Sequence, residues 1–177
     1  LLGVENQLAI DMDMPLRVIG YDGSSYRDEM NQDEIVIDEE TGKKHKIRHK
    51  RYPVVTIVLY FGKVPWKKPL SLYDVLEISD DLKPFVNDYK INLIDVPRLT
   101  GEQVEKFTSD FQIIADYFVQ LSKNKDYVPK DKIIRHTDSF LKLMSVLTQD
   151  NKYVEMGREL SHDKQPGNMS TQFLKSF

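Results

Sequence analysis

The sequence of 177 residues contains no cysteine, which excludes a disulfide framework, a thiolate zinc site and a cysteine nucleophile. It also lacks an apolar run approaching the ~20 residues that a membrane-spanning helix needs. Charge of one sign is not in excess, because 25 Lys and Arg face 28 Asp and Glu. The net charge of −3 excludes a global basic field for nucleic acid but allows a local basic patch. We therefore expect a cytoplasmic protein with no membrane partner.

Several catalytic patterns are missing as well. No glycine-rich phosphate loop occurs, which excludes a P-loop ATPase. Ser24 and Ser25 lack the elbow motif of a serine hydrolase. The four histidines (His45, His49, His136 and His162) are scattered, and none has metal-ligand spacing with an acid.

Hydrophobic periodicity predicts a mixed α/β chain. Strands are predicted over residues 3–10, 53–62 and 89–96, and a polar hairpin over 34–49. The run at 53–62 is typical of a central strand covered on both faces. A helix is predicted from Met14 to about Met30, with Asp13 at its cap and Leu16, Ile19 and Tyr26 as its apolar stripe. A short helix is predicted after Ser71.

From Thr100 the pattern becomes helical. Thr100 and Gln103 form a capping box, and an apolar stripe from Phe107 to Leu121 predicts one helix. A second helix is predicted over about 131–148, with a short helix and a tail in 150–177. We expect two parts: a core over 1–99 and a helical appendage with a tail over 100–177. Three core strands make a thin sheet, and the chain opens inside a strand, so we expect an N-terminally truncated domain.

Glu5 and Gln7 are the first candidates for chemistry. Two residues apart on a strand, they leave from the same face, where a carboxylate and a polar head can hold a divalent metal and a phosphate. A single carboxylate does not hold Mg²⁺ alone, and a solvated strand edge gives the same pattern. Asp11 and Asp13 could serve as substitute ligands, although cap and turn positions account for both.

Several segments in order carry a family resemblance: residues 3–7 (GVENQ), 14–17 (MPLR), 21–22 (YD), 53–62 (PVVTIVLYFG) and 85–94 (FVNDYKINLI). Together they resemble the bacterial transposases of the PD-(D/E)xK nuclease superfamily, also described as recombination-promoting nucleases. The resemblance covers about residues 1–150 and is densest over 1–96. It implies part of a restriction-endonuclease-like mixed sheet flanked by helices, followed by the C-terminal helical appendage.

The resemblance also implies a site. Glu5 falls at the metal-binding acid of the second family motif, and Asn6 would offer its backbone carbonyl to the same Mg²⁺ or Mn²⁺. Gln7 stands where the wider superfamily has lysine, so it would be a weaker electrophilic partner. Arg17 and Tyr21, four apart on the next helix, would contact the scissile phosphate or brace Glu5. A plain surface pair on that helix is the alternative.

One departure limits this reading. The family's first motif, an aspartate on a preceding strand, would lie upstream of Glu5, where only four residues stand. We therefore expect half of a metal site, and an endonuclease-like domain that is inactive as this chain.

The basic run at 43–51 is the strongest charge cluster, and six of its side chains are candidates for contact with DNA: Lys43, Lys44, Lys46, Arg48, Lys50 and Arg51. Acidic residues at 33–40 precede it, so across a hairpin the two halves would instead pair. Lys63, Lys67 and Lys68 around Trp66 read as solvated lysines beside a packed tryptophan.

Two further functions stay open beside a metal-dependent DNA endonuclease. A catalytically silent binding module would form a homodimer through an exposed sheet edge. A structural scaffold without a nucleic-acid role is the third, because the chain is acidic.

Overall fold

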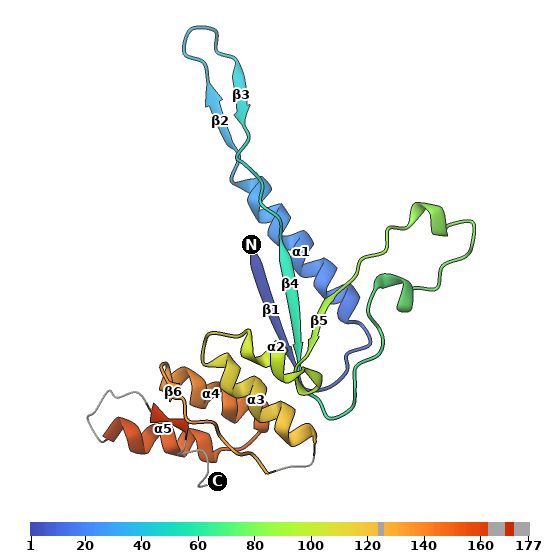
Figure 1. The fold of residues 1–177 in the computed structure, drawn as a ribbon. Coiled ribbons are helices and arrows are strands. Elements are labelled where there is room, and N and C mark those ends of the chain that lie inside the picture. The colour runs from blue at the N-terminus through green and yellow to red at the C-terminus, as the bar shows by residue number, and fades with distance from the viewer. Residues whose placement is uncertain (124–125, 163–168, 172–177) are drawn as a thin grey trace. The chain divides into compact units, whose positions relative to one another are not determined.

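The computed structural model describes residues 1–123, 126–162 and 169–171, which form two compact units. Unit 1 comprises residues 1–59 and 66–94, and unit 2 comprises residues 60–65 and 95–177. The mixed α/β fold with C-terminal helices is confirmed (Figure 1). The assignment of functional domains to 1–99 and 100–177 stays a prediction.

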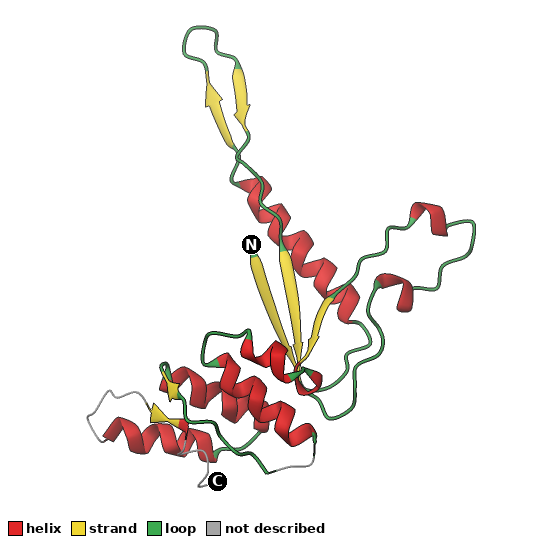
Figure 2. Ribbon diagram, viewed as in Figure 1, coloured by secondary structure: helices red, strands yellow, loops and turns green. Residues whose placement is uncertain are grey.

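Unit 1 is built on a three-stranded parallel sheet of β1 (Leu2–Gln7), β4 (Val55–Tyr60) and β5 (Asn92–Asp95), in the order β1-β4-β5 (Figure 2). β4 is the central strand, as its β-branched run predicts. Its alternate residues Thr56, Val58 and Tyr60 are buried, whereas Ile57 and Leu59 between them are only half-buried. The prediction that β4 is covered on both faces is therefore wrong, and one face of the sheet carries most of the burial.

Helix α1 (Met14–Asn31) covers that buried face, and its range agrees with the prediction. The residues that it turns inward are different from those expected. Met14, Val18 and Asp22, four apart, are buried. The predicted apolar stripe is wrong, because its members lie exposed on the helix: Leu16, Ile19 and Tyr26. Burial of an aspartate is possible here because two hydroxyl groups donate to its carboxylate.

The predicted hairpin is confirmed as the antiparallel pair β2 (Glu34–Ile37) and β3 (Lys44–Ile47), which projects beyond the end of α1 (Figure 1). Its turn is fastened by Asp38, whose carboxylate accepts hydrogen bonds from the Thr41 N–H and hydroxyl at 2.7 and 2.8 Å. Gly42 closes the turn with a φ of 65°, a conformation that glycine adopts at no steric cost. All eight strand residues are exposed.

A long connection links β4 to β5. Trp66 is buried in it, and its indole N–H donates to the Pro69 carbonyl at 3.0 Å. The short helix predicted after Ser71 is a single 3-10 turn, η1 (Leu72–Asp74), followed by a second, η2 (Lys83–Phe85). β5 is shorter than the predicted strand and continues into η3 (Val96–Arg98).

Unit 2 holds the helices α2 (Gly101–Glu105), α3 (Phe111–Ser122), α4 (Thr137–Thr148) and α5 (Lys152–His162), with the short strand pair β6 (Ile133–Ile134) and β7 (Met169–Ser170). The Thr100–Gln103 capping box is confirmed. The single helix predicted from Thr100 to Leu121 is wrong, because α2 ends and α3 begins anew. The predicted tail falls partly on residues 163–168 and 172–177, outside the described residues.

The core of unit 2 gathers around α3 and α4. The ring centroids of Phe61 and Phe118 lie 5.0 Å apart, in the range of a favourable aromatic pair. The helix predicted over about 131–148 begins only at Thr137, so Ile134 lies on β6 instead. The apolar residues predicted for it are nevertheless all buried: Ile134, Phe140, Leu141, Met144 and Leu147. Within the described residues, no helix combines the length and the apolar character needed to cross a bilayer.

Candidate functional site

Glu5 and Gln7 lie side by side on the face of β1 that α1 covers. Both are half-buried, whereas Asn6 between them is exposed on the opposite face, as the two-residue period of a strand requires. The Gln7 amide Nε2 donates to Glu5 Oε1 at 2.9 Å. The structure thus brings the predicted pair together, with the Gln7 side chain held against the carboxylate.

Arg17 joins this pair from α1. Its Nη2 donates to Glu5 Oε1 at 2.6 Å, and its Nε and Nη2 both donate to the Tyr21 hydroxyl, at 3.1 and 2.9 Å. The Tyr21 oxygen accepts both bonds, so its own hydrogen points to other acceptors. Of the predicted arrangements, the structure has Arg17 bracing Glu5. The four predicted side chains (Glu5, Gln7, Arg17 and Tyr21) therefore form one cluster, which we call the Glu5 cluster.

Asp11 belongs to the same cluster, although its position between strand and helix reads as a turn residue. Its Oδ2 accepts from Arg17 Nη1 at 2.6 Å and its Oδ1 accepts from the Asp13 N–H at 2.9 Å. Asp13 takes the N-cap position of α1, but its side chain makes no capping bond. No sequence period links Asp11 to Glu5, because the turn between β1 and α1 brings them to the same guanidinium.

Charge pairing sets the protonation of the cluster. The hydrogen bond to Asp11, followed by that to Tyr21, raises the pKa of Arg17. Burial acts to raise the pKa of Asp11, but hydrogen bonds from Arg17 and from the Asp13 N–H outweigh it and hold this pKa below its ordinary value. The guanidinium and the Asp11 carboxylate are both charged at neutral pH as a result.

A second polar group lies deeper in unit 1 and supports the same helix. The buried Asp22 carboxylate accepts from Thr56 Oγ1 at 2.5 Å and, through its other oxygen, from the Tyr89 hydroxyl. A Cβ on Gly3 would lie 2.8 Å from Thr56 Oγ1, so glycine leaves room for this pair. Burial, with the hydrogen bond to Asp22, raises the pKa of Tyr89 to about 12. Sequence reasoning missed Asp22 as a buried anchor, because an acid in a helix is usually solvated.

An open groove of about 420 Å³ runs along β1 and α1 beside the Glu5 cluster. Glu5, Tyr21 and Ser25 give it polar walls, and Leu2 and Val4 are among its apolar ones. Since Glu5 and Tyr21 both line it, a ligand in this groove reaches the cluster directly.

Few oxygen atoms of the Glu5 cluster could be ligands of a metal ion. Among the described residues, no group of three or more Asp, Glu or His side chains is placed to hold an ion. Glu5 Oε1 accepts hydrogen bonds from both Gln7 and Arg17, whereas Glu5 Oε2 accepts none from the described residues. Mg²⁺ commonly takes one or two carboxylates and completes its shell with waters and substrate phosphates. The Glu5 cluster fits such a site, in which the chain supplies the smaller share of the ligands.

The six basic candidates of the run at 43–51 do not behave alike. Lys46 and Arg51 are ion-paired to Asp33 at 3.2 and 2.6 Å, and Arg51 also donates to the Glu29 carbonyl at 2.8 Å. These two therefore hold the base of the hairpin. The other four have no acidic partner among the described residues: Lys43, Lys44, Arg48 and Lys50.

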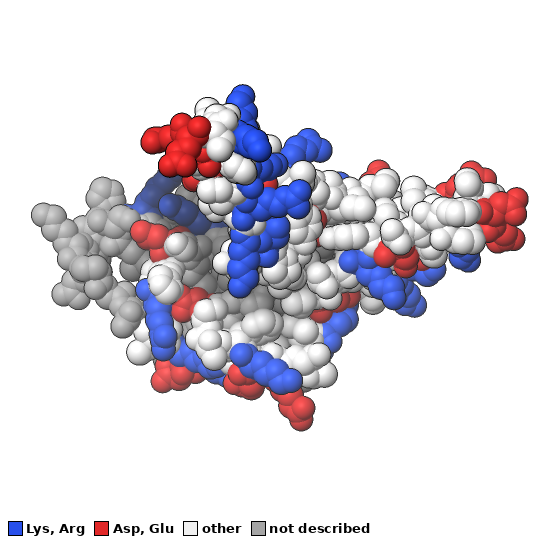
Figure 3. All heavy atoms as spheres, turned by 90° about the horizontal axis from the view of Figure 1, so that it is seen from above, with Lys and Arg blue, Asp and Glu red and all other residues white. Residues whose placement is uncertain are grey.

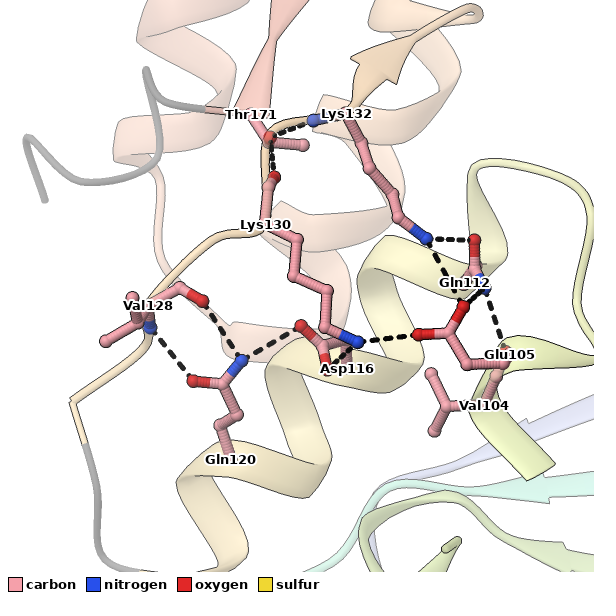
Figure 4. A network of polar contacts seen from close by, with 9 residues as sticks. All are labelled: Val104, Glu105, Gln112, Asp116, Gln120, Val128, Lys130, Lys132 and Thr171. Atoms are coloured by element: carbon pink, nitrogen blue, oxygen red, sulfur yellow. Dashed lines mark hydrogen bonds and ion pairs between the residues drawn. The ribbon is translucent and has the colours of Figure 1, made fainter. Parts of the chain in front are cut away.

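Unit 2 has a polar network of its own (Figure 4). Lys130 donates to Glu105 at 2.6 Å, and the Thr171 hydroxyl bridges the backbone of Lys130 and Lys132. The cavity beside this network measures about 10 Å³, the space of one water molecule. The network consequently fastens the loop before β6 to α2 and α3 and leaves no room for a substrate.

Comparison with known families completes this description. The family described as "Putative transposase, YhgA-like" matches residues 2–153, which include the Glu5 cluster and the basic run. No curated protein and no solved structure matches the chain. Because the match spans most of the sequence, this chain belongs to the YhgA-like transposase family.

Proposed function

We propose that unit 1 is a metal-dependent DNA endonuclease that hydrolyses a phosphodiester bond at the Glu5 cluster. The observation that carries the proposal is that Gln7 from β1 and Arg17 from α1 both donate to the Glu5 carboxylate. Membership of a transposase family supports DNA as the substrate. The resemblance to PD-(D/E)xK nucleases supports the reaction type. A DNA substrate would also place the protein in the cytoplasm.

Glu5 would hold the metal through Oε2, with the Asn6 carbonyl and the Gln7 amide oxygen as further donors. A bound Mg²⁺ or Mn²⁺ would supply Lewis-acid stabilisation of the phosphate and a water of lowered pKa. The aspartate of the family's first motif is not among the residues of the cluster, and Asp11 is the other carboxylate close to Arg17.

The other side chains bind and orient the substrate. Arg17 keeps its charge at neutral pH and presents a planar donor group that matches a phosphate. The Tyr21 hydroxyl lines the groove and has its hydrogen available to a phosphate oxygen. Gln7 holds the Glu5 carboxylate in place and brings no charge of its own. Asp11 positions Arg17 from the far side of the guanidinium.

A supercoiled-plasmid nicking assay with Mg²⁺ and with Mn²⁺ tests the proposal. The Asp11 carboxylate joins the cluster that lacks the first family motif, so in place of the inactive chain expected from the sequence we expect nicking, which should fall at least about 100-fold in Glu5→Gln, as loss of an essential electrostatic group does. Glu102→Gln is the matched control, because this exposed glutamate on α2 lies in unit 2. Undiminished nicking by Glu5→Gln would refute the assignment.

A catalytically silent binding or dimerisation module is the second candidate. It is favoured by the neutral Gln7 at the superfamily's lysine position and by β1, an edge strand with Leu2 and Val4 exposed at 69% and 54%. DNA binding without nicking in either metal would select this candidate. A concentration-dependent dimer in sedimentation velocity would then support pairing through the edge.

A further inference from the structure

We propose that the β2–β3 hairpin is a docking arm for double-stranded DNA, which it contacts along strand β3 and the residues that follow it. The inference rests on the proposed function, because it supplies the surface that would hold the duplex while the Glu5 cluster acts on it. Every residue of both hairpin strands is exposed, and the described residues cover neither face.

The register separates the side chains of the hairpin by face. Ile35 pairs with Lys46 and Ile37 with Lys44, so these four side chains share one face. Ile35 and Ile37 are 67% and 56% exposed, which leaves two apolar side chains flanked by two lysines. Contacts of this mixed kind suit a DNA groove, where apolar groups meet base methyls and cations meet phosphates.

The acids of the hairpin are spent or kept apart from these cations. Asp33 is taken up by Arg51 and Lys46, and Asp38 closes the turn. Glu34, at the start of β2 opposite Ile47, lies 3.8 Å from the His49 ring and is a further acid beside the basic strand. Glu39 and Glu40 remain at the tip. Seen from above, with the hairpin towards the viewer, one group of acidic side chains lies at the upper left and several Lys and Arg side chains lie beside it (Figure 3). The duplex would therefore lie along β3, away from the tip.

The basic side chains are spaced for a phosphate backbone. Residues 44–50 span at most about 20 Å when extended, and each DNA strand carries one phosphate per ~3.4 Å of axis. Three cations in this stretch have no acidic partner among the described residues, namely Lys44, Arg48 and Lys50. Each of them can neutralise one phosphate and release its counterion. A two-stranded β-ribbon also has the width that the major groove admits.

The hairpin is held ready for such a contact. Asp33 at its base accepts from Arg51 at 2.6 Å and from the His49 N–H at 3.1 Å, and Arg51 is tied to the Glu29 carbonyl of α1. An isolated two-stranded hairpin is marginally stable in water. The hydrogen bonds at its base and at the Asp38 turn therefore stabilise a hairpin that packs against no other described element.

Fluorescence anisotropy with a fluorescein-labelled 20-bp duplex, in EDTA and over 50–300 mM NaCl, tests the proposal. The triple variant Lys44→Gln/Arg48→Gln/Lys50→Gln should bind at least about tenfold more weakly at 100 mM salt and lose about 2.7 from the slope of log K against log salt. The matched control Lys106→Gln/Lys142→Gln/Lys152→Gln makes the same charge change on exposed residues of unit 2 and should lose less than about twofold. Circular dichroism verifies that both variants are folded.

Equal losses in the two triple variants would overturn the proposal, since general charge would then explain binding. Unchanged binding by the hairpin variant would overturn it as well. A dimer in sedimentation velocity that the hairpin variant abolishes, with DNA affinity intact, would assign the hairpin to contact between two copies instead. The nicking rate of Glu5→Gln tests the active site, and the DNA affinity measured in EDTA tests the hairpin. The proposed endonuclease activity and the proposed DNA contact of the hairpin can therefore be refuted independently.

Discussion

Arg17 donates a hydrogen bond of 2.6 Å to Glu5, and this bond ties the helix α1 to the end of the strand β1. The same guanidinium reaches Asp11 and Tyr21, so one side chain sets the positions of three others. The planar, forked shape of the guanidinium makes this possible, because its donors point in fixed and different directions.

Replacing Arg17 with lysine tests whether the forked shape of the guanidinium, rather than its charge alone, is needed. The ammonium group keeps the charge but does not reach Glu5, Asp11 and Tyr21 together, so we expect a loss of about 1 kcal/mol in the free energy of unfolding. Nicking should fall about tenfold or more. Urea denaturation and the plasmid assay measure the two effects. Arg27→Lys, on an exposed turn of the same helix, should change neither.

Replacing Gln7 with lysine should raise activity. A positive charge beside Glu5 restores the group that the wider superfamily carries, and it would stabilise the negative charge on the attacked phosphate. We expect about a tenfold gain in the nicking rate, equivalent to about 1.4 kcal/mol. Asn6→Lys adds the same charge on the opposite face of β1 and serves as the control. An equal gain from both variants would mean that net charge, rather than position, matters.

Replacing Asp22 with alanine should destabilise unit 1. The hydroxyl groups of Thr56 and Tyr89 would lose their acceptor inside the protein, at a cost of about 1–3 kcal/mol for an unsatisfied buried group. Asp28→Ala, exposed on the same helix, should cost less than about 0.5 kcal/mol. Urea denaturation compares the two variants, and equal values would show that the buried carboxylate does not support the fold.

The Asp33 anchor should fail in acid. The hydrogen bond from Arg51 comes first among the contacts that lower the pKa of Asp33 to about 2, from 3.8. Because the folded-state pKa is the lower one, the contribution of Asp33 is complete above pH 4 and is lost as the pH falls towards 2. The protection of the β2 and β3 amides from hydrogen exchange, relative to their intrinsic rate at each pH, should therefore fall over that window in the native chain. In Asp33→Asn this protection should be low at every pH, whereas Asp81→Asn should match the native chain.

Replacing Thr171 with valine tests the polar network of unit 2. The hydroxyl is buried and serves both the Lys132 N–H and the Lys130 carbonyl, so both would lose a partner. We expect a loss of about 1–3 kcal/mol in the free energy of unfolding. Thr108→Val, on an exposed stretch between α2 and α3, should stay within about 0.5 kcal/mol of the native chain. A Thr171→Val variant as stable as that control would show that the bridge contributes nothing.

The sequence predicted the elements of unit 1 better than the packing between them. The position of β4 and the hairpin could be predicted, because β-branched runs and turn residues are local signals. The inward face of α1 could not be predicted. The burial of Asp22 depends on hydrogen bonds from two hydroxyl groups that lie 34 and 67 residues away in the chain. Asp11 could be considered a substitute metal ligand, but its contact with Arg17 could not be predicted. Its role depends on a turn that no periodicity encodes.

The break between α2 and α3 shows a different limit. The apolar stripe from Phe107 to Leu121 continues in period across the gap, so it predicts one helix. The residues between the two helices, 106–110, leave the helix, and Asp110 at the N-cap of α3 accepts from the backbone N–H groups of Arg135 and His136. Such a contact lies 25 residues away in the chain, so the local hydrophobic period gives no sign of it.

Trp66 gives this molecule an optical probe for one of its halves. It is the sole tryptophan in the sequence, it is 5% exposed, and it belongs to unit 1. Its emission should be blue-shifted in the folded chain and should move to the red when unit 1 opens, whatever happens to the helices of unit 2. Tryptophan emission and helical ellipticity, recorded in the same titration, would then reveal whether the two halves melt together or one after the other.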